Sequence, residues 1–573
     1  MEYQTLKTDV LILGSGGAGL FAALHACRAN PELDVTIAVK GLLGKCGCTR
    51  MVQGGYNVAL SPGDSIERHF MDTIIGGKWL PDQAMAMRLC ETAVIRVQEL
   101  ENELGCFFDR NEDGSLHHKA FAGQTFDRTV HKGDLTGIEI ISRLMEQVRA
   151  QRVQLMEEHR AIALVPSRDG DALAGVLMID MRSGEFRLVQ AKTVLMATGG
   201  GPTMYRYHTP SGDKSMDGLA MALRLGLGLR DMEMVQFHPT GLLAGRDTRM
   251  TGTVLEEGLR GAGGFLLDGN GERFMKSYDD DAERATRDIV SRAIYAEMRE
   301  GRTTPNGGVY IAMSHLGADV VAQKFPGMVK RCADCGFDLA GGRVEVVPTA
   351  HYLMGGVVVT PDTRTSLAGL FVAGEDAGGA HGANRLGGNG VANSTVFGGI
   401  AGDEMAAQAS LQNFWIDPDT SLIEAAIEQT MTPYLQAVGD INSIRDRLLD
   451  VMWDGVGVLR DANGIRQAQT ELASLKTELM ATGLGDDNRV FNLSWHDWLN
   501  LQSLIEVSEI IAAAALSREN SRGAHYREDY PEAGGLDESY FTIARVDREA
   551  LQVERQPVEF SIVKPGESLL END

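Results

Sequence analysis

The chain has little cysteine and few aromatic residues for its length. Seven cysteines occur in 573 residues, and aromatic residues make up 6%. An odd, sparse set of cysteines is typical of reduced thiols in a cytoplasm rather than of a disulfide scaffold. No apolar run approaches about 18 residues, and no signal-peptide pattern is present at the N-terminus. We therefore expect a cytoplasmic chain with no transmembrane segment of its own, which could still dock to a membrane partner.

Positive charge is also in short supply. Lysine and arginine number 54 against 79 aspartates and glutamates, giving a formal charge of −25. This balance argues against non-specific nucleic-acid binding, so any anionic substrate needs a local basic pocket. Hydrophobic residues make up 43% and charged residues 23%, which is ordinary for a globular protein. The length predicts two to four domains.

The strongest local pattern lies in residues 8–24, TDVLILGSGGAGLFAAL. The apolar run 10–13 predicts a buried strand, the glycine-rich residues 14–19 a tight turn, and residues 20–24 the start of a helix. Glycines in this context let the backbone approach a pyrophosphate at the helix N-terminus. The pattern predicts a bound dinucleotide, with a purely structural turn as the alternative.

Later segments indicate which dinucleotide binds and how the fold is assembled. A second predicted strand, residues 34–40, ends in Lys40, where an NAD-binding unit would carry Asp or Glu. This departure favours FAD. Two further strand–glycine units, at 193–200 and 369–376, imply a nucleotide fold built from distant segments, with an insertion between about 240 and 350. Residues 420–520 are predicted mostly helical, and 540–564 alternate like three short strands.

These segments resemble, in order and spacing, the flavoprotein subunit of succinate dehydrogenase and fumarate reductase, with L-aspartate oxidase as a related branch. The resemblance runs from about residue 8 to residue 530. The matching motifs are LGSGGAGL (13–20), QGG (53–55), FAGQ (121–124), MATGG (196–200), MDGLAMA (216–222), FHPTG (237–241), LEEGLRGAGG (255–264), RDIVSR (287–292), PTAHYLMGG (348–356), AGEDAGGAHGANRLGGN (373–389) and SRGAHYRED (521–529).

The resemblance implies an α/β fold in which a Rossmann-like FAD-binding domain carries an inserted α+β capping domain and is followed by a helical domain. The expected FAD-binding domain is discontinuous, formed by 1–238 and 351–415. The capping domain would span 239–350 and the helical domain 416–530. Residues 531–573 would form a C-terminal tail with short strands. The active site would then lie between the flavin and the cap.

The same resemblance implies a set of FAD contacts. They are Gly14, Ser15, Gly16, Gly17, Ala18, Gly19, Lys40, Cys48, Thr49, Gln53, Gly54, Gly55, Ala161, Asp217, Glu375, Arg385, Gly390 and Val391. Glu375 would hold ribose or ribityl hydroxyls. Cys48 stands where many relatives carry a histidine that is bonded to FAD, so we expect non-covalent FAD, with a cysteinyl thioether left open. Losing the covalent bond is expected to impair succinate oxidation more than fumarate reduction, which favours a reductase.

Substrate and proton-transfer residues also follow from the resemblance. His351 and Arg385 would bind one carboxylate of a small dicarboxylate, and His238 the other, with the arginine fork suited to bidentate binding. Arg287 would donate the proton. Glu257 and Arg260 would relay protons from solvent. The structural alternatives are core histidines and an Arg287 that merely pairs with a neighbouring acid, Asp288 or Glu283.

Glu256 is a departure from the family, whose members carry a threonine at this position. A glutamate there would repel a dianionic substrate unless it is protonated or turned away. It therefore leaves open a different substrate, such as an acid with an amino or hydroxyl group or a larger unsaturated acid. The structural alternative is an exposed acidic pair formed by Glu256 and Glu257. L-aspartate oxidase is the main alternative activity, but it carries R-E-G-G-H-S where this chain has FAGQ. A non-catalytic FAD-binding assembly subunit is a further alternative, which the intact set of site residues disfavours.

No metal site is expected. Cys332 and Cys335 form a lone CxxC, and Cys46 and Cys48 are likewise too few, because a zinc or cluster site needs about four ligands. Electrons would therefore come from a separate iron–sulfur subunit or a small soluble donor. Such a partner could place the chain at the inner face of a membrane. The oligomeric state stays open.

Overall fold

The computed structural model describes residues 2–245, 248–547 and 550–570, so the outermost predicted positions, 1 and 571–573, lie outside it. Its main sheet is built around β1 (Tyr3–Leu13), which pairs in parallel with β2 (Val35–Val39) and β9 (Glu185–Met196). Strand order is β6-β2-β1-β9-β8-β7, and β16 (Leu370–Val372) also runs parallel to β9. The outer strands are β6 (Val153–Glu157), β7 (His159–Pro166) and β8 (Leu173–Asp180). The predicted Rossmann-like α/β fold is confirmed.

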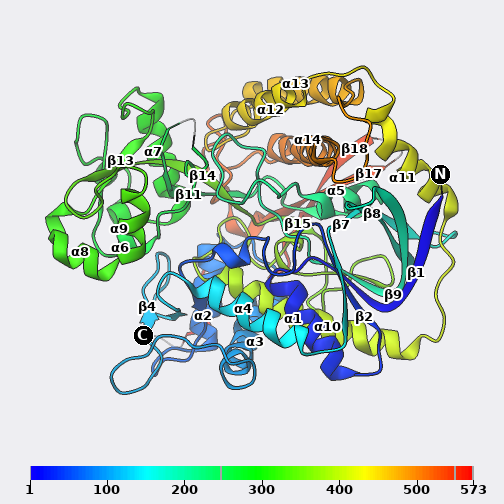
Figure 1. Cartoon of the computed structure of the whole chain (residues 1–573). Helices are drawn as coiled ribbons and strands as arrows, with labels where there is room; N and C mark the ends of the chain where they lie inside the picture. The colour runs from blue at the N-terminus through cyan, green and yellow to red at the C-terminus, as the bar shows by residue number, and fades with distance from the viewer. Residues whose placement is uncertain (1, 246–247, 548–549, 571–573) are drawn as a thin grey trace.

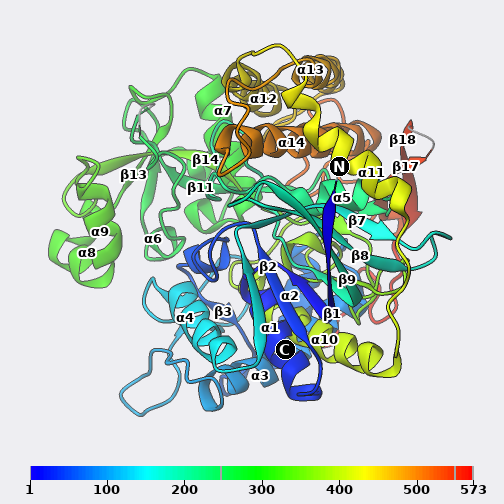
Figure 2. The ribbon, with the colours of Figure 1, turned by 45° about the vertical axis from the view of Figure 1, so that its right-hand side comes forward.

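Helices cover one face of this sheet (Figures 1 and 2). They are α1 (Gly17–Ala29), α2 (Ile66–Gly76), α3 (Gln83–Asn102), α4 (Thr136–Arg149) and α10 (Asn389–Leu411). Helices α1 and α10 meet closely because Gly398 faces the α1 backbone, where a Cβ would lie 2.5 Å from the oxygen of Ala18. The run Val10–Leu13 is fully buried, as expected for a parallel strand covered on both faces. The short strands β3 (Tyr56–Asn57), β4 (His118–Lys119) and β5 (Thr129–Val130) form a separate small sheet.

The insertion forms a lobe at the left of Figure 1, joined to the rest by two long strands. These are β11 (Val235–Leu242) and β14 (Arg343–Leu353), which continue into β13 (Val309–Ala312) and β12 (Phe265–Leu267). The lobe also contains α6 (Gly258–Gly261), α7 (Arg287–Arg299), α8 (Ala318–Lys324) and α9 (Pro326–Ala333). Its core is its own, since one cluster of buried side chains lies entirely between Leu242 and Val346. Strands β11 and β14 cross the predicted limits of the capping domain at 239 and 350.

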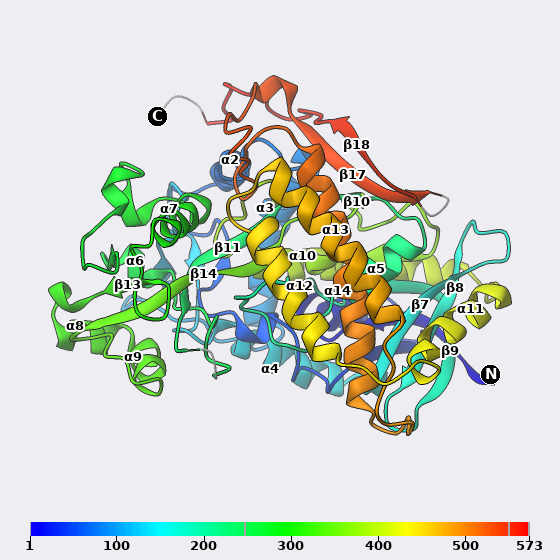
Figure 3. The same ribbon diagram turned by 90° about the horizontal axis from the view of Figure 1, so that it is seen from above.

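Helices α12, α13 and α14 lie side by side over the other face of the molecule, as seen from above in Figure 3. The helices of this region are α11 (Thr420–Met431), α12 (Ile441–Gly455), α13 (Ala462–Met480) and α14 (Leu493–Ser517). Each begins at a side chain that caps its first amides, namely Asp419, Asp440, Asp461 and Asn492. The predicted helical region is therefore present.

Helix α14 lies in the region predicted to be helical, but its apolar character was not predicted. It spans 25 residues, and an 18-residue window has a mean hydropathy of 1.4. By length and composition it could cross a membrane. However, 78% of that window is buried inside the protein, which is the environment of a core helix.

The C-terminal segment contacts two distant parts of the chain, a small sheet that contains β10 (Leu229–Arg230) and β15 (Gly356–Val357) and the start of α3. Strands β17 (Tyr540–Asp547) and β18 (Ala550–Pro557) form a hairpin, and β17 continues this sheet. The third strand predicted at 558–563 is wrong. There the backbone is instead held by Gln83 of α3, whose Oε1 accepts from the amides of Ile562 and Val563 at 2.7 and 3.0 Å.

Candidate active site

A cavity of about 820 Å³ runs from the glycine-rich turn to the lobe formed by the insertion. Its volume lies toward the upper end of small-molecule sites in proteins. All the predicted FAD contacts line it except Gly19. The predicted substrate and proton-transfer residues line its far end, apart from Arg260, which lies behind the wall. The structure thus gathers residues from widely separated segments around one space.

The glycine-rich turn at one end needs glycine for steric reasons. Gly14 has φ +109°, and a Cβ there would lie 2.2 Å from the oxygen of Ala197. A Cβ on Gly17 would meet the Ser394 hydroxyl at 2.5 Å. Gly19 has a different role, because a Cβ there would lie 2.1 Å from the oxygen of Gly14, so it lets the helix pack on the turn.

The N-cap residue of α1, Gly16, makes no side-chain cap, and the amide of Gly17 donates to Thr49 Oγ1 at 3.1 Å. The positive end of the helix dipole still faces the cavity, which favours an anion such as a pyrophosphate.

Next to the turn, a buried ion-pair network surrounds Asp217 of α5 (Asp217–Arg224). Lys40 Nζ lies 3.0 Å from one carboxylate oxygen, and Arg160 Nη2 lies 2.7 Å from the other. Burial alone would raise the pKa of Asp217, but these two cations outweigh it and hold the pKa well below its usual range. Arg160 and Asn500, which also bonds Lys40, were not predicted. Arg160 lies on β7 and Asn500 on α14, so the two residues come together only in the folded protein and leave no local pattern in the sequence.

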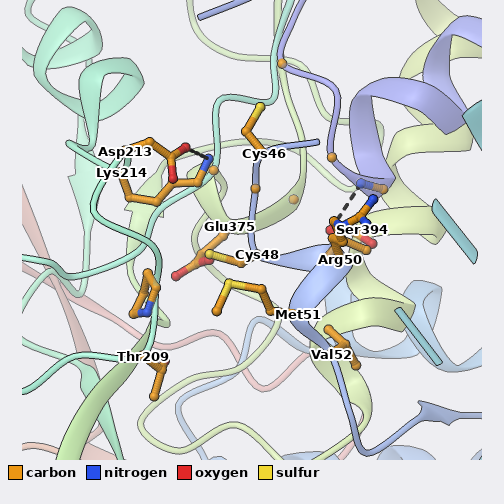
Figure 4. Close-up of a pocket in the computed structure, with 18 of the residues that line it drawn as sticks. Cys46, Cys48, Arg50, Met51, Val52, Thr209, Asp213, Lys214, Glu375 and Ser394 are labelled. Carbon is orange, nitrogen blue, oxygen red and sulfur yellow. Dashed lines mark hydrogen bonds and ion pairs between the residues drawn. The ribbon is translucent and has the colours of Figure 1, made fainter. Parts of the chain in front are cut away.

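Glu375 and Cys48 project into the middle of the cavity (Figure 4). Glu375 Oε1 accepts from the amides of Gly201 and Leu353, each at 3.0 Å, and burial raises the pKa of its carboxyl to about 7. Cys48 faces the cavity, and burial raises the pKa of its thiol to about 12. A thiol rather than a thiolate is a poor nucleophile. The glycine cradle, the N-terminus of α1 and these polar groups together fit FAD.

At the other end of the cavity the predicted proton-transfer residues come together. Arg287 of α7 donates to Glu257 Oε2 from Nη2 and Nε, at 2.5 and 3.0 Å. Arg260 Nη2 lies 3.5 Å from the other oxygen of Glu257. Burial alone would raise the pKa of Glu257, but Arg287 and Arg260 outweigh it and lower the pKa.

The alternative pairing of Arg287 with Glu283 or Asp288 is wrong. Glu283 pairs with Arg273, and Asp288 lies 3.5 Å from Arg292. Arg260 is only 1% exposed and donates to the backbone oxygen of Glu283 at 2.6 Å. It is therefore placed behind Glu257 rather than at the protein surface.

Gln236, which was not predicted as a site residue, is a hydrogen-bond acceptor shared by Arg287 and Arg385. Its Oε1 accepts from Arg287 Nη1 and from Arg385 Nη2, both at 3.1 Å. Arg385 also lies over the Tyr352 ring, 4.5 Å from its centroid, and its Nε has no partner among the described residues. Burial, with Arg287 nearby, lowers the pKa of Arg385 to about 10. The only sequence signal for Gln236 was its place two residues before His238.

The predicted histidines lie in contact across the same end. The rings of His238 and His351 are 5.4 Å apart and close to edge-on. Thr209 Oγ1 lies 2.8 Å from His351 Nδ1, and His238 Nδ1 accepts from the Thr240 amide at 3.3 Å. Burial, reinforced by Arg287, lowers the pKa of both histidines well below the usual value. Both imidazoles are thus oriented as neutral hydrogen-bonding groups.

Glu256 is neither exposed nor free. It is 4% exposed, and Lys119 Nζ of β4 lies 2.7 Å from its Oε1. Burial raises the pKa of its carboxyl, which Lys119 only partly offsets. The reading of Glu256 and Glu257 as an exposed acidic pair is wrong. Lys119, which is 137 residues away in the chain, was not predicted as part of the site.

Among the described residues no group of three or more His, Cys, Asp or Glu side chains could hold a metal ion. All seven cysteines are free, including Cys332 and Cys335.

Comparison with known proteins gives consistent matches over nearly the whole chain. Residues 9–391 match the family described as FAD binding domain, and residues 445–569 match fumarate reductase flavoprotein C-term. One of the subunits of the CoM/CoB fumarate reductase of Methanothermobacter marburgensis is 40% identical over 93% of this chain and 96% of that protein. The 8-methylmenaquinol:fumarate reductase flavoprotein subunit of Wolinella succinogenes is 35% identical over 91% and 86%. A solved structure of FrdA from E. coli quinol fumarate reductase superposes with a TM-score of 0.92, at 31% identity over 98% of this chain and 99% of that one.

Proposed function

This chain belongs to the fumarate reductase and succinate dehydrogenase flavoprotein family, and we propose that it interconverts fumarate, or a similar unsaturated C4 dicarboxylate, and succinate. Membership makes it an FAD-dependent flavoprotein oxidoreductase. The observation that carries the finer proposal is the buried cluster in which Gln236 joins Arg287 to Arg385 beside two neutral histidines. Such a cluster of buried side chains offers cations and hydrogen-bond donors to two carboxylates.

Substrate binding is assigned to three side chains. Arg385 and His351 hold one carboxylate, and His238 helps to hold the other. The Nε of Arg385, without a partner among the described residues, supports this role, because a buried guanidinium donor needs an acceptor. Holding both carboxylates fixes the double bond in position between them, which contributes to the rate by orientation.

FAD, when bound, would supply the hydride for one carbon of the double bond. Arg287 gives the proton to the other carbon. Arginine is a weak acid, so proton transfer requires a strongly basic developing carbanion and rapid reprotonation of the guanidinium. Glu257, 2.5 Å from Arg287 Nη2, is assigned to that reprotonation, and Arg260 supports Glu257 from behind.

We propose that FAD is bound without a covalent link and that the enzyme works chiefly as a reductase. The neutral Cys48 thiol supports the first point, since thioether formation needs a thiolate. The second point follows from the family trend in which loss of the flavin link impairs succinate oxidation more than fumarate reduction. Equal or faster succinate oxidation by the purified protein would contradict it.

Electrons are proposed to come from an iron–sulfur subunit or a small soluble donor. The relatives named above are called subunits, which supports a partner. A cytoplasmic site, peripheral to the inner face of a membrane through that partner, is proposed with it. An L-aspartate oxidase-like activity has less support, because Glu256 is engaged by Lys119 rather than free to hold an ammonium group.

The test is fumarate-dependent oxidation of reduced viologen by the purified FAD-bound protein without oxygen. Turnover that saturates with fumarate is the expected result, and crotonate, which lacks the second carboxylate, is expected to be a poor substrate. A protein that retains FAD but does not turn over fumarate would show that the site serves another acid.

A further inference from the structure

An ion pair between Lys119 and Glu256 joins two separate parts of the chain at the substrate end of the cavity. Lys119 lies on β4, in the part of the molecule that packs below the lobe in Figure 1. Glu256 lies just before α6, inside the lobe, and lines the cavity next to Glu257. The two side chains are 22% and 4% exposed, so the pair is largely screened from water.

Lys119 is the cation that compensates Glu256. The other charged groups around Glu256 include Asp134 and Glu257, which are both acidic. Glu257 is already engaged by Arg287 and Arg260. Lys119 is fixed in place by a second hydrogen bond, from Nζ to the oxygen of Gly133 at 2.9 Å. Glu256 has no other ion-pair partner among the described residues.

We propose that Lys119 is a specificity-determining residue that acts through Glu256, cancelling a carboxylate of the cavity wall that would otherwise repel the second carboxylate of a dicarboxylate substrate. The inference rests on the proposed function, because it concerns the same substrate. A carboxylate in the cavity wall opposes a dianion most strongly when water is excluded. Lys119 removes that opposition and also prevents Glu256 from serving an ammonium-bearing substrate.

The pair therefore explains how a dicarboxylate site accommodates an acidic residue in its wall. If Lys119 is lost, Glu256 faces the substrate without a partner. A ligand with two carboxylates then suffers more than a ligand with one. If Glu256 is also made neutral, the penalty disappears, because nothing remains for Lys119 to cancel.

The experiment measures dissociation constants of fumarate and crotonate from the FAD-bound protein, by the change in flavin absorbance on titration without turnover. Lys119→Met should weaken fumarate binding at least tenfold, or about 1.4 kcal/mol, and crotonate binding less than threefold. Lys119→Met combined with Glu256→Gln should restore fumarate binding to within threefold of wild type. Lys132→Met is the matched control, because Lys132 makes a similar ion pair at 3.0 Å, but its partner Asp109, unlike Glu256, does not line the cavity.

The outcomes separate this inference from the proposed function. Equal weakening of both ligands by Lys119→Met, or failure of the double variant to recover, would assign Lys119 a merely structural role and overturn the inference. Unchanged fumarate binding in Lys119→Met would overturn it as well. Tight fumarate binding without turnover by the wild type would refute the proposed function and leave the inference to be decided by the variants. A wild type that binds neither ligand would overturn both.

Discussion

The two ends of the cavity are built in different ways. At the glycine-rich end, the backbone itself shapes the site, and Gly14 and Gly17 allow contacts that any side chain would block. At the substrate end, Arg287 of α7 and Arg385, which precedes α10, share Gln236 of β11 as a hydrogen-bond acceptor. The first end depends on a short continuous segment, whereas the second depends on lobes that meet only in the folded protein. Substitutions at the glycine-rich end should therefore reduce stability, FAD binding or both, whereas substitutions at the substrate end should reduce turnover.

The largest effect is expected from Arg287→Ala at the substrate end. Removing the proposed proton donor should lower kcat for fumarate about 10³-fold, while the ratio of FAD to protein stays that of the wild type. Steady-state viologen oxidation and the flavin absorbance measure the two quantities. Arg299→Ala is the control, since it lies on the same helix but pairs with Glu528 in a half-exposed position. Retained turnover in Arg287→Ala would refute the assignment.

At the glycine-rich end, Gly14→Ala should affect folding and FAD together. Its φ of +109° and the 2.2 Å approach to Ala197 both disfavour a Cβ, so we expect a loss of about 3 kcal/mol in the free energy of unfolding. Denaturant unfolding and the FAD content of the purified protein measure the effect.

Gly16→Ala provides the matched comparison for this end. A Cβ on Gly16 has room, with its nearest neighbour, Thr49 Oγ1, 3.5 Å away. This variant should fold with nearly wild-type stability and lose FAD affinity alone, because only the approach of the pyrophosphate is obstructed. Equal stability of the two variants would mean that the turn is less constrained than its geometry indicates.

The smallest effect is expected between the two ends, at Glu375. Burial raises its pKa from an ordinary 4.5 to about 7, so the folded FAD-free protein holds a proton that the unfolded chain releases. This contribution to stability is fully present below pH 4.5 and is lost as pH rises to about 7, on the order of 1–3 kcal/mol. Denaturant unfolding of the apoprotein at several pH values measures it. Glu375→Gln should flatten this part of the profile, and an identical profile would refute the raised pKa.

The sequence predicted the glycine-rich end better than the substrate end, for a physical reason. A strand, a turn and a helix that follow one another leave a contiguous pattern, so the cradle at residues 14–18 could be predicted from local spacing. The motifs also located the catalytic candidates, and the structure brings them together. The motifs did not include the residues that hold these side chains in place. Gln236, Lys119 and Arg160 contact Arg287, Glu256 and Asp217, which are far away in the chain.

One predicted strand and one structural alternative were wrong, and the apolar character of one predicted helix was overlooked, because tertiary packing overrides local pattern. The alternation at 558–563 suggested a strand, but backbone amides of this segment donate to the Gln83 side chain instead of to a neighbouring strand. Arg287 had acidic neighbours in sequence, yet the helix directs it to Glu257. The apolar character of α14 was missed because polar residues interrupt it, several of which, such as Gln502, Glu506 and Ser508, are buried in the folded protein.

Because β1 pairs in parallel with the distant strand β9, the central sheet cannot form until well into translation. Leu11 pairs with Val194, about 180 residues later, so at 5–20 residues per second β1 waits about 10 to 40 s for this neighbour. Strand β16 and Glu375 are made only after about as long again. The ribosome therefore exposes an unfinished apolar sheet through most of translation. Flavin loading is then a late event, and the nascent chain should depend on chaperones more than its final stability suggests.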